Sequence, residues 1–185
     1  MLIATERLVL RRFRAGDAEN LAAYRSAPGV ARYQSWDTPY SLERARYAIE
    51  TMAAADPAEP GWFQYAVELK AGRTHIGDVG VNLNDNRMQA EIGYTIAPDR
   101  QGHGFATEAV RAVLERLFTV QGLHKVSAEC DARNIASARL LEQVGFIREG
   151  LLREQTWIKN EWTDDLLYGL LADEWTAQEG PDQAS

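Results

Sequence analysis

Two glycines, Gly102 and Gly104, stand directly before a long segment whose apolar residues recur at helical spacing to about residue 118. The stretch before them has the composition of a strand. First-turn amides of a helix have no internal partner, and the aligned peptide dipoles make that end partly positive. Because glycine lets the backbone approach a ligand closely, the segment predicts a pyrophosphate site, to which Arg100 and Thr107 can add a charge and a hydroxyl.

Glycines before a helix can also form a turn that only links two elements, so other nucleotide motifs need to be compared. A P-loop closes with Gly-Lys-Ser/Thr, where this chain has His103, Gly104 and Phe105. A dinucleotide-binding fingerprint expects a third Gly or Ala where Thr107 stands, and an early rather than a late βαβ unit. Neither motif matches.

A second segment, NIASARLLEQVGF, follows after one more strand. Asn134 begins a predicted short helix, Ser137 lies one turn into it, and Gly145 closes it. Taken alone, Asn134 is a suitable helix N-cap and Ser137 a suitable surface serine.

The two segments together resemble the GNAT superfamily of N-acetyltransferases. The run QGHGFA at 101–106 matches the signature Gln/Arg-x-x-Gly-x-Gly/Ala, which binds the pyrophosphate of coenzyme A in that superfamily. The segments TERLVLRRF and REGLLRE…WTDDLLYGLL are similar to the RimJ/RimL branch, members of which acetylate N-terminal amines of ribosomal proteins. The likeness runs from about Thr5 to Trp175.

The resemblance implies acetyl-CoA as co-substrate. It places the backbone of Thr95 and Ile96 along the pantetheine arm, a strand amide near Tyr94 at the thioester carbonyl, and Asn134 in a hydrogen bond to the arm. The residues implied at the pyrophosphate are Gln101, Gly102, His103, Gly104, Phe105, Ala106 and Thr107.

The catalytic groups are less completely specified by the resemblance. Many GNAT enzymes have a tyrosine just before the Gly-Phe pair as the acid for the leaving thiolate, and this chain has Leu141 there. Ser137 is the replacement that the RimJ/RimL likeness suggests. Glu91 is the first candidate for the base, with a solvent-facing strand carboxylate as the alternative. One corner of the branch uses a glutamate where Thr156 stands, so that Glu154 or Asp164 would have to serve instead.

Aromatic residues occupy the segments that form the acceptor wall in this family: Trp36, Tyr40, Trp157 and Trp162. They can hold an amine by cation–π contact or pack into the core. The sequence therefore predicts acetyl transfer to a primary amine, either a protein N-terminus or a small molecule. Because Leu141 replaces the usual tyrosine, a non-catalytic acetyl-CoA-binding or sensor module is the alternative, and a nucleotide-binding regulator is a third hypothesis.

These motifs need a sheet to position them. Alternating or apolar runs predict strands near residues 8–12, 63–69, 76–83, 90–96, 125–130, 146–156 and 163–172. Helices are predicted from an Asp17 cap to Tyr24, ended by Pro28 and Gly29, and over 41–55, 104–118 and 134–144. This pattern predicts one α/β domain over residues 1–178, with a mixed, mostly antiparallel sheet, helices on both faces and a flexible tail at 179–185. A splayed central strand pair is implied by the GNAT resemblance.

Composition limits the other functions. The formal charge of −7 argues against a nucleic-acid partner, and neither a signal-like start nor a membrane-length apolar run is present, so we expect no membrane partner and a cytoplasmic location. The three histidines are scattered, which predicts no metal site. The single cysteine, Cys130, is expected to be a buried strand thiol rather than a nucleophile. A monomer or a homodimer is expected.

Overall fold

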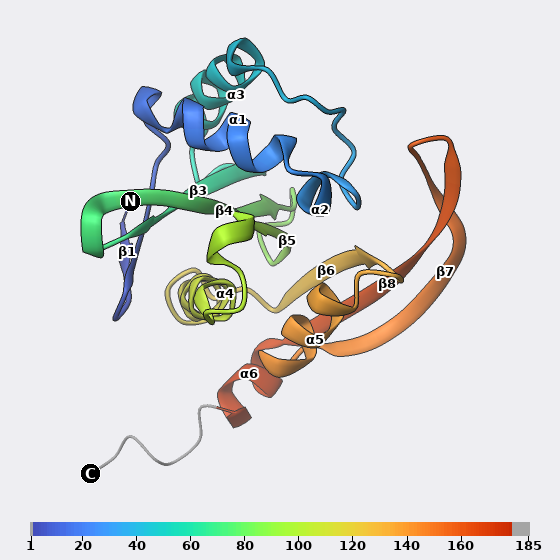
Figure 1. Cartoon of the computed structure of the whole chain (residues 1–185). Coiled ribbons are helices and arrows are strands. Elements are labelled where there is room, and N and C mark those ends of the chain that lie inside the picture. The colour runs from blue at the N-terminus through green and yellow to red at the C-terminus, as the bar shows by residue number, and fades with distance from the viewer. Residues whose placement is uncertain (1, 179–185) are drawn as a thin grey trace.

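A single eight-stranded sheet forms the centre of the computed structural model, which describes residues 2–178; the predicted tail at 179–185 lies outside them. The strand order is β1-β2-β3-β4-β5-β6-β8-β7 (Figure 1). Only β5 and β6 run parallel to each other. The strands are β1 (Ile3–Ala4), β2 (Leu8–Arg11), β3 (Gly61–Leu69), β4 (Thr74–Leu83), β5 (Gln89–Ile96), β6 (Lys125–Asp131), β7 (Ile147–Ile158) and β8 (Glu161–Leu171).

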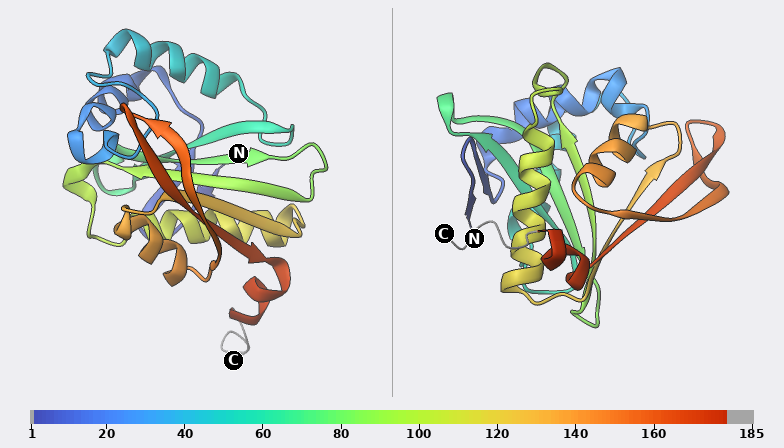
Figure 2. Two further views of the ribbon diagram at one scale, coloured as in Figure 1. Left: turned by 90° about the vertical axis from the view of Figure 1, so that its right-hand side faces the viewer. Right: turned by 90° about the horizontal axis from the view of Figure 1, so that it is seen from below.

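Helices cover both faces of this sheet (Figure 2). The helices are α1 (Ala18–Ser26), α2 (Pro28–Ala31), α3 (Leu42–Ala54), α4 (Phe105–Glu115), α5 (Ile135–Gln143) and α6 (Ala172–Gln178), and a π-helical turn, Arg116–Val120, continues α4. The predicted mixed, mostly antiparallel α/β fold with helices on both faces is therefore confirmed. Within residues 2–178, each helix is too short or too polar to cross a bilayer.

Alternation along the strands divides the interior into two apolar clusters. On β3, Tyr65 and Val67 point into the larger cluster, beneath α4, whereas Ala66 belongs to the smaller one, beneath α1 and α3. Each fully buried side chain of this kind stabilises the fold by roughly 1.5–3 kcal/mol. Because successive strand residues face opposite sides, one sheet supports a helix layer on each face.

Three element ends differ in detail from the sequence prediction. Asp17 is the N-cap residue of α1, as predicted, but its side chain makes no capping hydrogen bond, because its carboxylate is held by the buried Arg11 guanidinium at 2.7 and 2.8 Å. The helix α1 ends at Ser26, before Pro28 as predicted, but Pro28 then starts a second helix, α2, at whose first turn its missing N–H costs no hydrogen bond. The last strand, predicted to reach residue 172, stops at Leu171. A helix that was not predicted, α6, follows it, with Trp175 buried against the core. By contrast, Ser41 caps α3 as predicted, accepting from the amide of Arg44.

The central parallel pair separates partway along its length. Pairing runs from Gln89 with Lys125 to Ile92 with Ala128, and stops there, although β5 continues to Ile96 and β6 to Asp131. The splayed strand pair implied by the resemblance is therefore present. Its opening exposes strand backbone at the centre of the sheet.

Candidate functional site

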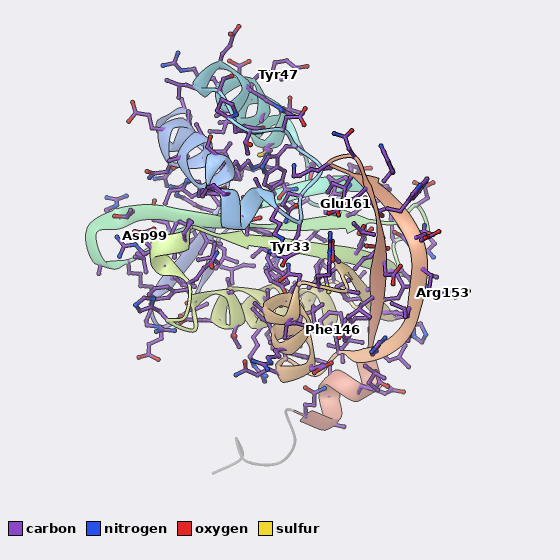
Figure 3. All side chains as sticks on the ribbon, turned by 45° about the vertical axis from the view of Figure 1, so that its right-hand side comes forward. Tyr33, Tyr47, Asp99, Phe146, Arg153 and Glu161 are labelled. Atoms are coloured by element: carbon purple, nitrogen blue, oxygen red, sulfur yellow. The ribbon has the colours of Figure 1, made fainter. Side chains whose placement is uncertain are left out.

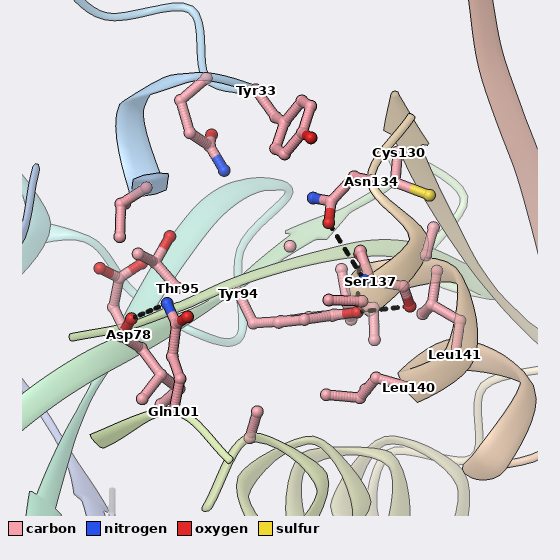
Figure 4. A pocket seen from close by; sticks show the side chains of 18 of the residues that line it. Tyr33, Asp78, Tyr94, Thr95, Gln101, Cys130, Asn134, Ser137, Leu140 and Leu141 are labelled. Carbon is pink, nitrogen blue, oxygen red and sulfur yellow. Dashed lines mark hydrogen bonds between the residues drawn. The ribbon is translucent and has the colours of Figure 1, made fainter. Parts of the chain in front are cut away.

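A cavity of about 850 Å³ begins where β5 and β6 separate (Figure 4). Its walls come from the end of α1, α2 and the loop after it, the glycine loop, and the start of α5. Most of the sequence-predicted site residues line it: Trp36, Glu91, Thr95, Ile96, Gln101, Gly102, Gly104, Phe105, Ala106, Thr107, Asn134 and Ser137. His103 is not among the lining residues; its ring stacks on Phe105 and contacts the Gln101 carbonyl.

The glycine loop has the backbone geometry that the sequence suggested. Gly102 and Gly104 have φ of +75° and +79°, in the left-handed region that side chains disfavour. Gly104 is the N-cap of α4, so the amides of the next residues lack helical partners and carry the positive end of the dipole. Nothing lies within 4 Å of a Cβ built on Gly102, which leaves open space over the loop. These features fit a pyrophosphate.

Arg7 lies beside this loop, a placement that no local sequence motif predicted. Its guanidinium donates to the His103 carbonyl at 3.0 Å, pairs with Glu108 at 2.6 Å and lies over the Phe105 ring. Partial burial acts to raise the pKa of Glu108, but hydrogen bonds from Thr5 and Arg7 hold it below its ordinary value. The ion pair neutralises the one carboxylate in the first turn of α4, next to the predicted phosphate position.

Strand geometry decides which backbone groups face the gap. The carbonyl of Thr95 lies against Gly77 of β4, and Ala97 donates to Ile76 on the same strand. Because paired residues alternate along an antiparallel ladder, the backbone of Tyr94 and Ile96 faces the opposite, β6 side. The two predicted arm-binding residues thus differ: Ile96 has backbone at the gap, whereas Thr95 has its backbone turned to β4.

The Ile96 carbonyl accepts from the Gln101 side chain at 2.9 Å. Gln101 therefore ties the glycine loop to the end of β5, and the Ile96 amide remains directed toward the gap.

Three polar groups meet at the centre of the cavity. The hydroxyls of Tyr94 and Ser137 are 2.8 Å apart, and Tyr94 also donates to the Ser137 carbonyl at 3.1 Å (Figure 4). Asn134 caps α5 by accepting from the Ser137 amide at 3.2 Å, which fixes this turn. Burial raises the pKa of the Tyr94 phenol, so it keeps its proton. Cys130, also beside Ser137, is buried as predicted, and burial raises the pKa of its thiol.

The Tyr94 phenol was not identified by sequence reasoning, which considered only a backbone amide at this position. The signal was present, since Tyr94 faces the same side of β5 as the buried Ile92 and Ile96. Leu141, at the position of the usual tyrosine, is buried in the main core and contributes no polar group.

One side of the cavity, where the acceptor is predicted to bind, is aromatic. Trp36 lines it, held by its Nε1 donating to the Arg25 carbonyl at 2.9 Å and by the Arg25 guanidinium over its ring at 4.6 Å. Tyr33 (Figure 3), whose hydroxyl donates to the Arg133 carbonyl, also lines it. Trp62 is a further lining residue. Neither was a sequence candidate.

Three predicted acceptor residues lie elsewhere. Tyr40 is buried in the smaller cluster, where its hydroxyl accepts from Arg25 at 3.2 Å. The β7–β8 hairpin extends away from the rest of the sheet (Figure 1). Trp157 and Trp162 are each 57% exposed near its tip, with their rings edge-on to each other. None of the three lines the cavity.

Carboxylates line the cavity opposite the glycine loop. Glu91 on β5 and Glu129 on β6 lie on neighbouring strands, and neither has an ion pair among the described residues. The alternative bases suggested by sequence lie outside the lining: Asp164 accepts from the Glu154 amide at 2.7 Å. Thr156, which stands where one corner of the branch has a glutamate, donates a hydrogen bond to Asp165.

Metal-ligating side chains do not gather in this site. Over residues 2–178, no group of three or more His, Cys, Asp or Glu side chains could hold a metal ion. The expectation of a metal-free site stays a prediction.

Comparison with known proteins gives one family. Residues 7–147 match the Acetyltransferase (GNAT) domain family. The chain is 33% identical over 171 residues to the uncharacterized N-acetyltransferase YoaA of Bacillus subtilis, covering 92% of this chain and 96% of YoaA. It is 32% identical over 85 residues to the ribosomal protein uS5-alanine N-acetyltransferase of Escherichia coli, covering 46% of this chain and 44% of that protein.

Solved structures give the same result. The crystal structure of a GNAT-family acetyltransferase from Bacillus anthracis superimposes with a TM-score of 0.85 at 28% identity, covering 94% of this chain and 99% of that one. A spermidine N-acetyltransferase from Vibrio cholerae, in complex with CoA and spermine, has a TM-score of 0.79 at 26% identity, covering 92% of this chain and 99% of that one.

Proposed function

The chain belongs to the GNAT acetyltransferase family of acetyl-CoA-dependent enzymes, and on that basis we propose that it transfers an acetyl group to a primary amine by direct attack on the thioester. One observation carries this proposal. The gap between β5 and β6 joins a glycine loop suited to a pyrophosphate with an aromatic wall that carries two carboxylates without ion pairs. A donor and an amine can therefore meet at the centre of the sheet.

In this proposal the protein binds and orients the donor along β5. The loop amides after Gly104 hold the pyrophosphate, and backbone of Ile96 and the Asn134 side chain hold the pantetheine arm. The Tyr94 amide polarises the carbonyl, and a pre-aimed donor of this kind is worth about 3 kcal/mol. Acetyl-CoA supplies the thioester carbonyl and a thiolate leaving group.

Two groups handle protons on the leaving-group side. Ser137 and Tyr94 share a hydrogen bond beside the gap, so that either hydroxyl can deliver a proton while the other restores it. Because a thiol has a pKa near ~8.5, its thiolate leaves readily, and this acid contributes modestly. On the acceptor side, a carboxylate removes a proton from the amine; Glu91 is the residue that the sequence indicated.

The acceptor is either a protein N-terminus or a small-molecule amine. Partial likeness to the uS5-alanine enzyme supports the RimJ/RimL branch and a protein N-terminus. The fold likeness to a spermidine enzyme and the two carboxylates support a cationic small molecule. The cytoplasmic location stays a prediction that cell fractionation tests.

An acceptor panel tests the proposed function. The purified chain is incubated with acetyl-CoA and, separately, a hexapeptide with a free N-terminal alanine, spermidine and an aminoglycoside. We expect free thiol and an acetylated product from at least one acceptor. Tight acetyl-CoA binding in calorimetry without turnover on any acceptor would instead support the non-catalytic sensor that Leu141 suggested.

A further inference from the structure

Glu129 on the cavity wall has a second carboxyl group, that of Asp165, beside it on the neighbouring strand. Glu129 lies on β6 beyond the last residue paired with β5, and lines the cavity. Asp165 lies diagonally across from it on β8, because Glu129 pairs with Leu167 and Asp131 pairs with Asp165. The two carboxyl groups are on the same face of the sheet, because residues two apart along a strand point to the same side. The negative charge of Asp165 therefore acts on Glu129 across the strand pair.

The residues around Glu129 and Asp165 leave both carboxyl groups without a cation. Asp165 is only 4% exposed and accepts a hydrogen bond from Thr156, which fixes its position. Its direct cross-strand neighbour, Asp131, is already neutralised by Arg133 at 2.7 Å. No described cation therefore pairs with Glu129.

The other charges near the cavity are also accounted for. From β5, Glu91 adds a second negative charge on the same wall. From α1, Arg25 is directed to Asp78 of β4 at 3.8 Å and stacks on Trp36. On the Glu129 strand itself, the Cys130 thiol belongs to the main core, on the other face of the sheet.

These charges act on Glu129 in one direction. The cavity wall removes part of its hydration, and Asp165 and Glu91 add negative charge, so the pKa of Glu129 is raised above its ordinary value. A general base is most effective when its pKa lies near the working pH, and an ordinary glutamate is too acidic for that.

We propose that Glu129 accepts the proton of the acceptor's ammonium group, and that Asp165 is a positioning residue whose negative charge, diagonally across on β8, favours this transfer. The assignment rests on the proposed acetyltransferase function and deepens it. It moves the base from Glu91, the sequence candidate, to the next strand. The carboxylates without ion pairs on this wall also select a cationic amine over a neutral or anionic acceptor.

The proton and bond changes balance. The acceptor R–NH₃⁺ gives one proton to the Glu129 carboxylate, leaving R–NH₂ and a neutral carboxylic acid. The nitrogen lone pair forms the C–N bond to the acetyl carbon as the C–S bond breaks, and the second proton lost by nitrogen ends on sulfur. Each turnover gives one amide, one free thiol and one proton that Glu129 returns to water.

The first test does not depend on turnover. Carbon-13 NMR of glutamate-labelled full-length protein follows the Glu129 carboxyl through a pH titration, with the signal assigned by its loss in Glu129→Gln. We expect a midpoint above the ordinary value for a glutamate, and a lower midpoint in Asp165→Asn. An ordinary midpoint that Asp165→Asn leaves unchanged would overturn the role of the pair.

The second test measures kcat with spermidine and with the alanine hexapeptide at saturating acetyl-CoA. Glu129→Gln should lower kcat on the order of a hundredfold at pH 7, the scale of general base catalysis, with unchanged acetyl-CoA affinity in calorimetry. The deficit should shrink as pH approaches the amine pKa, since more acceptor is then already neutral. Glu129→Asp should retain more activity than Glu129→Gln, and the exposed control Glu50→Gln on α3 should match the wild type.

A failure of the proposed function and a failure of the Glu129 assignment give different results. No turnover by the wild-type chain on either probe would overturn the proposed function, and the assignment of Glu129 with it. Wild-type turnover that Glu129→Gln leaves intact would overturn the assignment alone. A kcat deficit that stays constant up to high pH would indicate a structural effect, and would also overturn it. Asp165→Asn is expected to shift the acidic limb of the kcat profile to lower pH.

Discussion

Gly104→Val tests the glycine loop because it changes backbone geometry without filling the cavity. Gly104 has φ of +79°, and a Cβ there would approach only the far end of Arg7, at 3.4 Å. Valine disfavours this φ, at a cost of roughly 1–2 kcal/mol or more, so the backbone should move toward negative φ. That movement turns the first amides of α4 away from the predicted phosphate position.

The expected loss of acetyl-CoA affinity follows from those amides. A hydrogen bond to a charged group contributes about 1.5–3 kcal/mol, so losing two of them costs about 3 kcal/mol or more. This corresponds to a Kd on the order of a hundredfold higher. Isothermal titration calorimetry with acetyl-CoA measures it directly, and the Michaelis constant for the amine should change far less.

Gly122→Val is the matched control. Gly122 also has positive φ, +68°, with nothing within 4 Å of a built Cβ, but it follows the far end of the α4 segment and does not line the cavity. Both variants should lose similar stability in urea unfolding, and only Gly104→Val should lose affinity. Equal acetyl-CoA affinity in the folded Gly104→Val variant and the wild type would refute the phosphate-loop assignment.

Three further perturbations have distinct expected outcomes. Ser137→Ala and Tyr94→Phe should each lower kcat with acetyl-CoA affinity little changed, because their proposed role arises only as the thiolate leaves; a matching loss of affinity would contradict this. Arg7→Ala should weaken acetyl-CoA binding by about tenfold, since it leaves the Glu108 carboxylate unpaired beside the loop; calorimetry that finds unchanged affinity would exclude the contribution. Burial lowers the pKa of His75, so the unfolded chain takes up its proton first and the folded state loses stability as pH falls below about 6.5. Urea unfolding at pH 7.5 and 5.5 should therefore show a larger loss of unfolding free energy for the wild type than for His75→Leu. Equal losses would contradict this role of His75.

The glycine loop and the cap of α5 could be predicted from sequence because both are local. Gly102 and Gly104 impose their backbone conformation within a few residues, and Asn134 caps the helix that follows it directly. The alternation of apolar and polar residues likewise predicted the strands of the sheet. Asp17 is at the predicted N-cap position, but the ion pair of its side chain with Arg11 could not be predicted, because Arg11 lies on a strand whose position relative to the helix is not a local feature.

The acceptor wall could not be predicted because it depends on distant pairing. The diagonal placement of Glu129 and Asp165 follows from the register of β6 with β8, which one sequence does not reveal. Arg7 reaches the loop from the start of the chain for the same reason. Trp157 was placed at the acceptor by resemblance, but the β7–β8 hairpin carries it beyond the cavity.

The central claim is acetyl transfer to an amine, and the balance between the two products tests it most directly. The purified chain is given acetyl-CoA labelled in the acetyl group together with spermidine or the alanine hexapeptide, and free thiol and labelled acetylated amine are followed over the same time course. The account predicts that the two products rise together, one for one, and that little thiol appears without an acceptor. Thiol release that does not depend on the amine, with labelled acetate as the product, would contradict it.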